Sequence, residues 1–232
     1  LARHVRSAAG LAFDPWVAIL GFPFIPQAAR HRYSELEIKA GAVDQPVVGK
    51  VTLEATMHDI DLTEASWLIR PDADLRLGKL ESRIIVDSRH LGGFIGIKDL
   101  TVEAPAEETN DATGGTTESG ISGSVGLIFT GTPKSAGFDK PVSVTVDLAT
   151  TGPDQTTVDF TPTAVVTGPN TADTAVPDDK RAAVLGAFRA AMPDQRLPFG
   201  LRPTRVGARG SDIIIEGITE DITVTLEGFR QR

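Results

Sequence analysis

Residues that could perform catalysis or bind a metal ion are few and scattered in this chain. The four histidines, His4, His31, His58 and His90, lie in different segments, and none are spaced like a helical zinc site. The chain contains no cysteine, which excludes disulfides, thiolate ligands and a cysteine nucleophile. These observations predict a protein with no metal, no cofactor and no catalytic residue.

Two short stretches resemble catalytic or metal-binding motifs. "GISGS" (Gly120–Ser124) is similar to a nucleophile elbow, but it lacks the closing glycine and the strand–turn–helix context. "HDIDLTE" (His58–Glu64) carries Asp59 and Asp61, but the glycine and distal glutamate of a calcium loop are missing. The chain also has no glycine-rich phosphate loop. The pattern therefore favours binding over turnover.

The elements that must position any site are mostly strands, because apolar and polar residues alternate from Glu35 onward. "WVAIL" (Trp16–Leu20) is a further short strand. The alternation changes phase between Met57 and Ile60, which predicts a bulge near His58. The alternating apolar positions fall in these segments: 36–40, 51–57, 60–62, 80–86, 100–102, 121–129, 142–148, 158–160, 206–215 and 222–226.

Helices are expected at four places. An apolar stripe predicts one over Leu1–Ala12, and shorter ones are expected at "TEASWLI" from Thr63 and "SRHLGGFIG" from Ser88. The longest is expected over Pro177–Met192, with acidic residues in its first turn and Pro193 at its end. The polar, acidic stretch 105–120 is expected to be a flexible loop. The fold class is therefore α+β and β-rich, in a single domain over residues 1–232.

The charge of the chain limits its partners. A formal net charge of −8 argues against nucleic acid, which is bound mainly by clustered Lys and Arg. Basic residues nevertheless gather near the N-terminus, between Arg70 and Lys98, and after Lys180, so one face can be less acidic than the total. The sequence starts at Leu1 without Met, from which we expect an upstream signal or anchor that is not part of it.

The alternating strands leave one apolar face that must be covered. A closed barrel or sandwich would cover it with the protein's own side chains. A long antiparallel sheet curled around the Pro177–Met192 helix would instead leave an apolar groove, because that helix is about 22 Å long and a ten-residue strand about 33 Å. Half a bilayer's hydrocarbon is about 15 Å thick, so an acyl chain fits beside the helix. Both arrangements are compatible with the pattern.

The turn "GFPFIPQ" places Phe22, Phe24 and Ile25 between prolines. One interpretation is a core staple, in which both phenylalanines pack under the sheet. The other places the turn at the end of the groove, where it closes the groove or touches a membrane.

Two stretches resemble the LmeA-type family of actinobacterial cell-envelope phospholipid-binding proteins. "DPWVAILGFPFIPQAARHRYSELEIKAGAV" (Asp14–Val43) is similar to the family's opening strand, G-F-P-F turn and following strand. "LPFGLRPTRVGARGSDIIIEGITEDITVTL" (Leu197–Leu226) is similar to its closing L-P-x-G-L turn and terminal strands. The acidic insert at 105–120 and Pro26 before Gln27 depart from the family pattern.

The resemblance implies a tubular lipid-binding (TULIP-like) half-barrel, a location in the periplasm or cell envelope, and a role in lipoglycan mannan elongation or envelope lipid trafficking. The implied partners are a phospholipid, a membrane surface bound peripherally, and a membrane mannosyltransferase. Arg30 and Arg32, with His31 between them, are candidates for contact with the head group. The candidate groove or mouth residues are Phe22, Phe24, Ile25, Leu36, Ile38, Leu53, Met57, Phe94, Leu127, Phe129, Leu185, Phe188, Met192 and Phe199.

Two other functions stay open at this point. The chain could be an envelope enzyme that acts on a lipid-linked glycan with paired carboxylates. It could also be a structural domain that assists a glycosyltransferase by contact alone.

Overall fold

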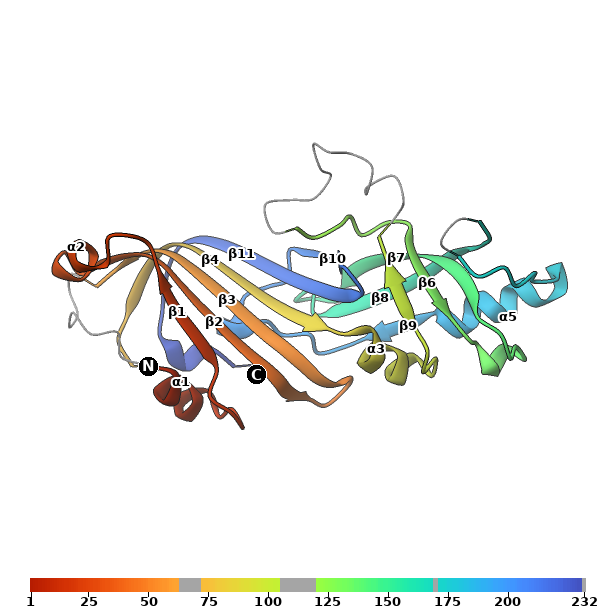
Figure 1. Cartoon of the computed structure of the whole chain (residues 1–232), viewed down its shortest axis with the longest axis horizontal. Coiled ribbons are helices and arrows are strands. Elements are labelled where there is room, and N and C mark those ends of the chain that lie inside the picture. The colour runs from red at the N-terminus through yellow and green to blue at the C-terminus, as the bar shows by residue number, and fades with distance from the viewer. Residues whose placement is uncertain (63–71, 105–119, 169–170, 231–232) are drawn as a thin grey trace.

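The computed structural model describes residues 1–62, 72–104, 120–168 and 171–230. Its strands form two antiparallel sheets, which lie end to end in an elongated molecule (Figure 1). The first sheet has the order β1 (Trp16–Leu20), β2 (Arg32–Gln45), β3 (Gly49–Asp61), β4 (Leu75–Val86), β11 (Asp212–Val224) and β10 (Arg205–Arg209). The second has the order β5 (Thr101–Glu103), β6 (Leu127–Gly131), β7 (Val142–Thr151), β8 (Thr157–Val166) and β9 (Ala190–Met192).

The alternation in the sequence produces the apolar face of the first sheet. Leu36 of β2 pairs with Met57 of β3, and Ala40 pairs with Leu53, so their side chains share one face, called here the inner face. The intervening residues, such as Glu37, lie on the outer face. The inner face and the apolar residues of the second sheet belong to one continuous core. The predicted β-rich antiparallel class is confirmed.

The bulge predicted near His58 can be compared with the observed strand pairing. Met57 and Ile60 are both buried, and Asp59 between them has a left-handed φ of 52°, so the change of phase is present. The pairing register of β3 with β2 nevertheless continues through it. The register shift lies instead in β2, between Ala40 and Val43. The prediction of a bulge near His58 is therefore wrong, because the shift in β2 lies opposite Leu53 and Val51.

The helices are short. They are α1 (Ala2–Ala9), α2 (Phe24–Ala29), α3 (Ser88–Ile95) and α5 (Asp178–Phe188), with 3-10 turns η1 (Lys134–Ala136), η2 (Pro198–Gly200) and η3 (Leu226–Gly228). The helix expected at Thr63 and nearly all of the loop expected at 105–120 lie outside the described residues. α1 ends before the predicted Ala12 because Gly10 adopts a left-handed φ of 68° as its C-cap. α2 was not predicted, because Pro23 precedes it and Pro26 lies within it.

The long sheet curled around a long helix is not confirmed. Two sheets replace the single one, and α5 ends at Phe188 because Ala190–Met192 pair with β8 as strand β9. α5 packs on β8 at the far end of the molecule and does not run along the first sheet (Figure 1). Short segments cover the inner face of the first sheet instead. Their buried side chains are Val5 of α1, Leu197 before η2, Leu226 of η3 and Phe229.

The strand predicted over 121–129 begins only at Leu127. The residues before it cross the outer face of the first sheet, where Ile121 packs with Ile85 and Ile214 in a second, small apolar cluster. Ser122 fixes this crossing, because its N–H donates to the carbonyl of Ala208 at 2.8 Å and its Oγ accepts from the Ala208 N–H at 3.0 Å.

Replacement of Phe229 should test how much this cover stabilises the fold. Its side chain is fully buried, and its ring centroid lies 5.9 Å from that of Phe199. We expect Phe229→Ala to lower the free energy of unfolding by about 3–5 kcal/mol, measured by urea denaturation. Phe22→Ala is the matched control, because Phe22 is 98% exposed and its loss should change stability by no more than about 0.5 kcal/mol. Similar losses of unfolding free energy in the two variants would contradict the assignment of Phe229 to the cover of the inner face.

Candidate functional site

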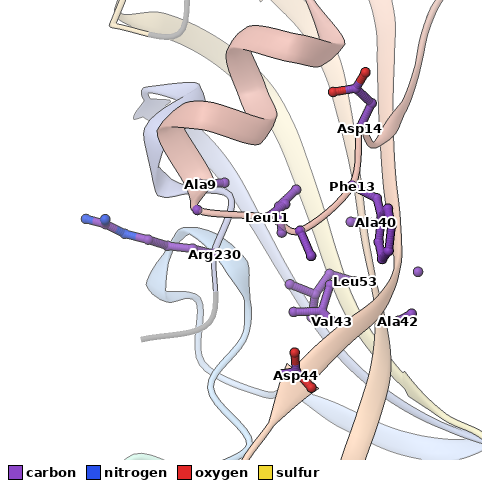
Figure 2. A pocket seen from close by; sticks show the side chains of 13 residues that line it. Ala9, Leu11, Phe13, Asp14, Ala40, Ala42, Val43, Asp44, Leu53 and Arg230 are labelled. Carbon is purple, nitrogen blue, oxygen red and sulfur yellow. The ribbon is translucent and has the colours of Figure 1, made fainter.

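A cavity of about 290 Å³ lies at one end of the inner face, beside the bulge of β2. Three pieces of chain enclose it: the end of α1 with the connection that follows, the bulged part of β2, and the segment after η3 (Figure 2). The residues that line it are Ala9, Gly10, Leu11, Ala12, Phe13, Asp14, Ala40, Gly41, Ala42, Val43, Asp44, Leu53 and Arg230.

Local sequence explains why a space forms here. Gly10 turns the chain out of α1, so residues 11–14 pass along the edge of β2 without entering the sheet. Within β2, Ala42 has a left-handed φ of 55° where the register shifts, and its neighbours Gly41 and Ala40 are small. Small side chains at a bulge leave room that the usual alternation of larger residues would fill. An ion pair between Arg6 and Asp14, at 3.2 Å, ties α1 to the connection.

Most of the side chains that line the cavity are apolar, although polar atoms contribute somewhat more of its accessible surface than apolar atoms do. Leu11, Val43 and Leu53 lie together on one side of it, and Phe13 stands beside Ala40 (Figure 2). Its lining contains no histidine, hydroxyl group or lysine among the described residues. A wall of this kind can bind an aliphatic group through burial of apolar surface.

The charged side chains of the lining stand at the rim of the cavity (Figure 2). Asp14 pairs with Arg6, and Asp44 pairs with Lys50 at 2.6 Å. The guanidinium of Arg230 extends away from the apolar side chains (Figure 2). Its Nε is buried and has no hydrogen-bond partner among the described residues. The rim therefore holds one cationic group whose hydrogen-bonding capacity is not fully used.

Most of the predicted groove residues lie in the closed core. Only Leu53 among them also lines the cavity, and Ile38 lines a depression on the outer face. The assignment of these residues to lipid contact stays a prediction. The fully buried ones are Leu36, Ile38, Leu53, Met57, Leu127, Phe129, Phe188 and Met192. The partly buried ones, packed against the same core, are Phe94, Leu185 and Phe199.

The turn at "GFPFIPQ" projects from the end of the first sheet, where α2 lies (Figure 1). Phe22 is 98% exposed and Ile25 is 80% exposed, so the core-staple interpretation is wrong for Phe22. The Phe24 side chain lies outside what the structure describes. Arg30, close behind these residues, is exposed and has no ion pair within the described part of the chain, whereas Arg32 pairs with Asp61 at 3.0 Å.

The sequence did not single out Leu11, Phe13, Val43 or Arg230 as site residues. A signal for part of the cavity was present, because "KAGAV" interrupts the alternation of β2 with consecutive small residues. No pattern in the sequence indicates that residues 9–14 and Arg230 meet this bulge, since the contact joins opposite ends of the chain.

The outer face of the first sheet holds the carboxylates that an enzyme would need. Glu54 pairs with Lys39 at 2.5 Å, and the buried Glu216 accepts from Nε of Arg83 at 2.6 Å. Glu37 lies in an open depression beside Trp16, and burial raises its pKa, with a further contribution from the neighbouring Glu35. Most of these charges neutralise one another, which is the usual state of a solvated sheet face.

The residues that the structure describes contain no group of three or more His, Cys, Asp or Glu side chains that could hold a metal ion. Asp59 and Asp61 do not form a site, because Asp61 pairs with Arg32 while Asp59 lies against Gly78. Within the described residues no helix is long and apolar enough to cross a membrane.

The pKa of Glu81 on the outer face generates a test of this charge network. Burial alone would raise that pKa, but the hydrogen bond from Lys79 and the charge of Arg83 outweigh it and lower the pKa. A lowered pKa contributes stability at neutral pH that is lost as the pH falls through the folded-state value. We expect Glu81→Gln to unfold at lower urea than the wild type at neutral pH, and the difference to shrink in acid.

Glu220→Gln is the control for this test, because Glu220 is exposed on the same face of the sheet. Urea midpoints measured across the acid range give the comparison. A deficit in Glu81→Gln that is equally large at every pH would contradict the electrostatic explanation.

Comparison with known proteins adds one finding. A model of the LmeA-like phospholipid-binding family matches residues 1–218, which include the second sheet, the first sheet up to the middle of β11, and every residue of the cavity except Arg230. No curated protein and no solved structure matches the chain. Since the match covers far more than half of the sequence, the chain belongs to the LmeA-like phospholipid-binding family.

Proposed function

We propose that this protein binds a phospholipid by inserting an acyl chain into the cavity beside the β2 bulge. The observation that supports the proposal most directly is the lining, in which Leu11, Phe13, Val43 and Leu53 surround a space that polar side chains reach only at the rim. Each buried methylene contributes about 0.8 kcal/mol, so affinity can arise without a polar contact.

The volume limits how much lipid the described form can hold. Pockets for drug-sized ligands occupy about 300–1,000 Å³, so about 290 Å³ suits one segment of an acyl chain better than a whole phospholipid. A longer stretch of lipid requires α1 and residues 10–14 to move away from β2. Among the α1 side chains that the structure describes, only Val5 is fully buried, so this movement separates little apolar surface.

A lipid that enters in this way would extend along the inner face. Leu53 lines the cavity, and its cross-strand neighbour Ala40 and the inner-face residues Ile38 and Leu36 continue from it along the sheet. We propose that these core residues become the wall of a larger groove when lipid is bound. The phosphate would then lie near the rim, where Arg230 supplies a positive charge.

The cellular role that we propose follows the family resemblance. The protein would act in the periplasm or cell envelope, exchange phospholipid with a membrane, and support lipoglycan mannan elongation or lipid trafficking, with a membrane mannosyltransferase as a partner. No described contact identifies that partner. The support for this part of the proposal is the family to which the chain belongs.

An envelope enzyme is the second candidate function. The observation in its favour is Glu37, whose raised pKa and proximity to Glu35 are features of catalytic carboxylate pairs. Hydrolysis of a lipid-linked sugar that is lost in Glu37→Gln would support this alternative. Without such turnover, the outer-face carboxylates are structural.

Filling the cavity tests the proposed lipid site. Ala9 lines the cavity, whereas Ala2 lies on the same helix outside its lining, and both are partly buried. We expect Ala9→Trp to occupy the space and to lower phospholipid binding by at least about tenfold, while Ala2→Trp retains it. Native mass spectrometry of delipidated protein incubated with phosphatidylglycerol vesicles measures the bound fraction.

Thermal unfolding gives an independent readout of the same test. A ligand that binds only the folded state stabilises it by about 2.7 kcal/mol at a hundredfold excess over Kd. The melting temperatures of wild type and Ala2→Trp should rise with lipid, and that of Ala9→Trp should not. If delipidated wild type takes up no phospholipid, the proposed function is wrong. If Ala9→Trp takes up as much as wild type, the lipid site is elsewhere.

A further inference from the structure

Exposed apolar side chains gather in one short part of the chain. Eight large apolar residues are exposed among the described residues, and five of them fall between positions 13 and 25. We call these five the N-terminal edge: Phe13, Trp16, Leu20, Phe22 and Ile25. Single exposed apolar residues are common on protein surfaces, but such a concentration marks an interaction site.

The fold places the N-terminal edge along one border of the molecule. β1 is the outermost strand of the first sheet, and Trp16 and Leu20 lie on it opposite Lys39 and Glu35 of β2. Phe13 precedes this strand, and Phe22 and Ile25 follow it at the projecting end that α2 forms (Figure 1). The five residues therefore follow one another from the cavity to the tip of the molecule.

The tip is held rigidly in its exposed position. Oε1 of Gln27 accepts from the backbone N–H and from Oγ of Ser34, both at 2.8 Å, and Nε2 of Gln27 donates to the carbonyl of Pro23 at 3.3 Å. Gly21 has a φ of 107°, and a Cβ there would lie 2.3 Å from Oγ of Ser34. The structure thus fixes a conformation in which the Phe22 side chain is exposed to water. This exposure is unfavourable, and a partner that buried the side chain would remove its cost.

The composition of this surface fits a lipid bilayer. Trp and Phe are the residues that settle at the boundary between head groups and acyl chains, and Ile and Leu reach further in. Basic residues flank the apolar ones, with Arg30 at the tip and Arg3 and His4 exposed on α1. Neither Arg30 nor Arg3 has an ion pair within the described residues, so the charge of both is available to anionic lipid although the whole chain is acidic.

Phe13 connects this surface to the cavity. It is 69% exposed and also lines the cavity beside Ala40 (Figure 2). We propose that the N-terminal edge is the surface by which the protein lies on an anionic bilayer, with Phe13 at the mouth of the cavity. An acyl chain could then pass from bilayer to cavity without crossing water. The inference rests on the proposed function, because it names the membrane-facing entrance of the same site.

Vesicle flotation tests the docking surface. The probes are vesicles of phosphatidylcholine with and without phosphatidylglycerol, and the variant is the double substitution Phe22→Ser with Ile25→Ser. We expect it to bind the anionic vesicles at least about tenfold more weakly than the wild type. The matched control is Val125→Ser with Ile218→Ser, which removes exposed apolar side chains outside the N-terminal edge and should leave binding unchanged.

A label at the mouth tests the orientation. The chain has no cysteine, so Phe13→Cys can carry a single environment-sensitive fluorophore. Its emission should shift to the blue when anionic vesicles are added, and Val125→Cys with the same label should not shift. Transfer of a fluorescent phospholipid between vesicles should slow in the Phe22 and Ile25 variant, while uptake of monomeric lysophospholipid should stay at the wild-type level.

The outcomes separate this inference from the proposed function. Vesicle binding by the double variant equal to that of wild type would overturn the inference, even if Ala9→Trp abolished lipid uptake. A wild-type dimer that the double variant converts to monomer would also overturn it, because the occupant of the edge would then be a second copy. Wild type that binds vesicles through the edge but never holds lipid would instead refute the proposed function.

Discussion

The inner face of the first sheet must be kept from water, and the rest of the structure depends on how this is done. Alternation of apolar and polar residues gives every long strand of this sheet an apolar side, and a sheet with such a side is stable only when something covers it. In this protein the cover is assembled from short segments around Val5, Leu197, Leu226 and Phe229. A cover in pieces is less continuous than one long helix, and the cavity lies where the pieces meet the β2 bulge.

The same constraint explains why core and site are hard to separate in this fold. A side chain such as Leu53 is fully buried and yet lines the cavity. In the proposed function, a lipid and the protein's own segments would compete for the same apolar surface, so one set of residues would serve as a packed core without ligand and as a wall with it. The outer face, in contrast, is occupied by paired charges and keeps its structure in either case.

The sequence predicted the elements better than their arrangement. Period-two alternation identified β2, β3, β4, β7 and β8, because half-buried strands impose it directly. The end of α5 was predicted wrongly. Ala190–Met192 have a composition that suits a helix, but in the structure they form backbone pairs with β8. The exposure of Phe22 could not be predicted, because a phenylalanine in a proline-bounded turn has the same local sequence whether it points in or out. The cavity depends on contacts between distant segments, which leave no local periodicity.

The meeting of α1 with η3 has a consequence for the order in which the fold can be completed. α1 belongs to the first residues of the sequence and η3 to the last, and the two lie together under the first sheet, with both termini nearby (Figure 1). During synthesis, strands β1 to β4 are therefore complete long before most of their cover exists, and their apolar side has to wait for Leu226 and Phe229. Loop closure over such a distance is slow. A chain that folds next to a membrane would spend that interval with an open apolar face and an abundant apolar molecule beside it, so its first lipid can be acquired during folding.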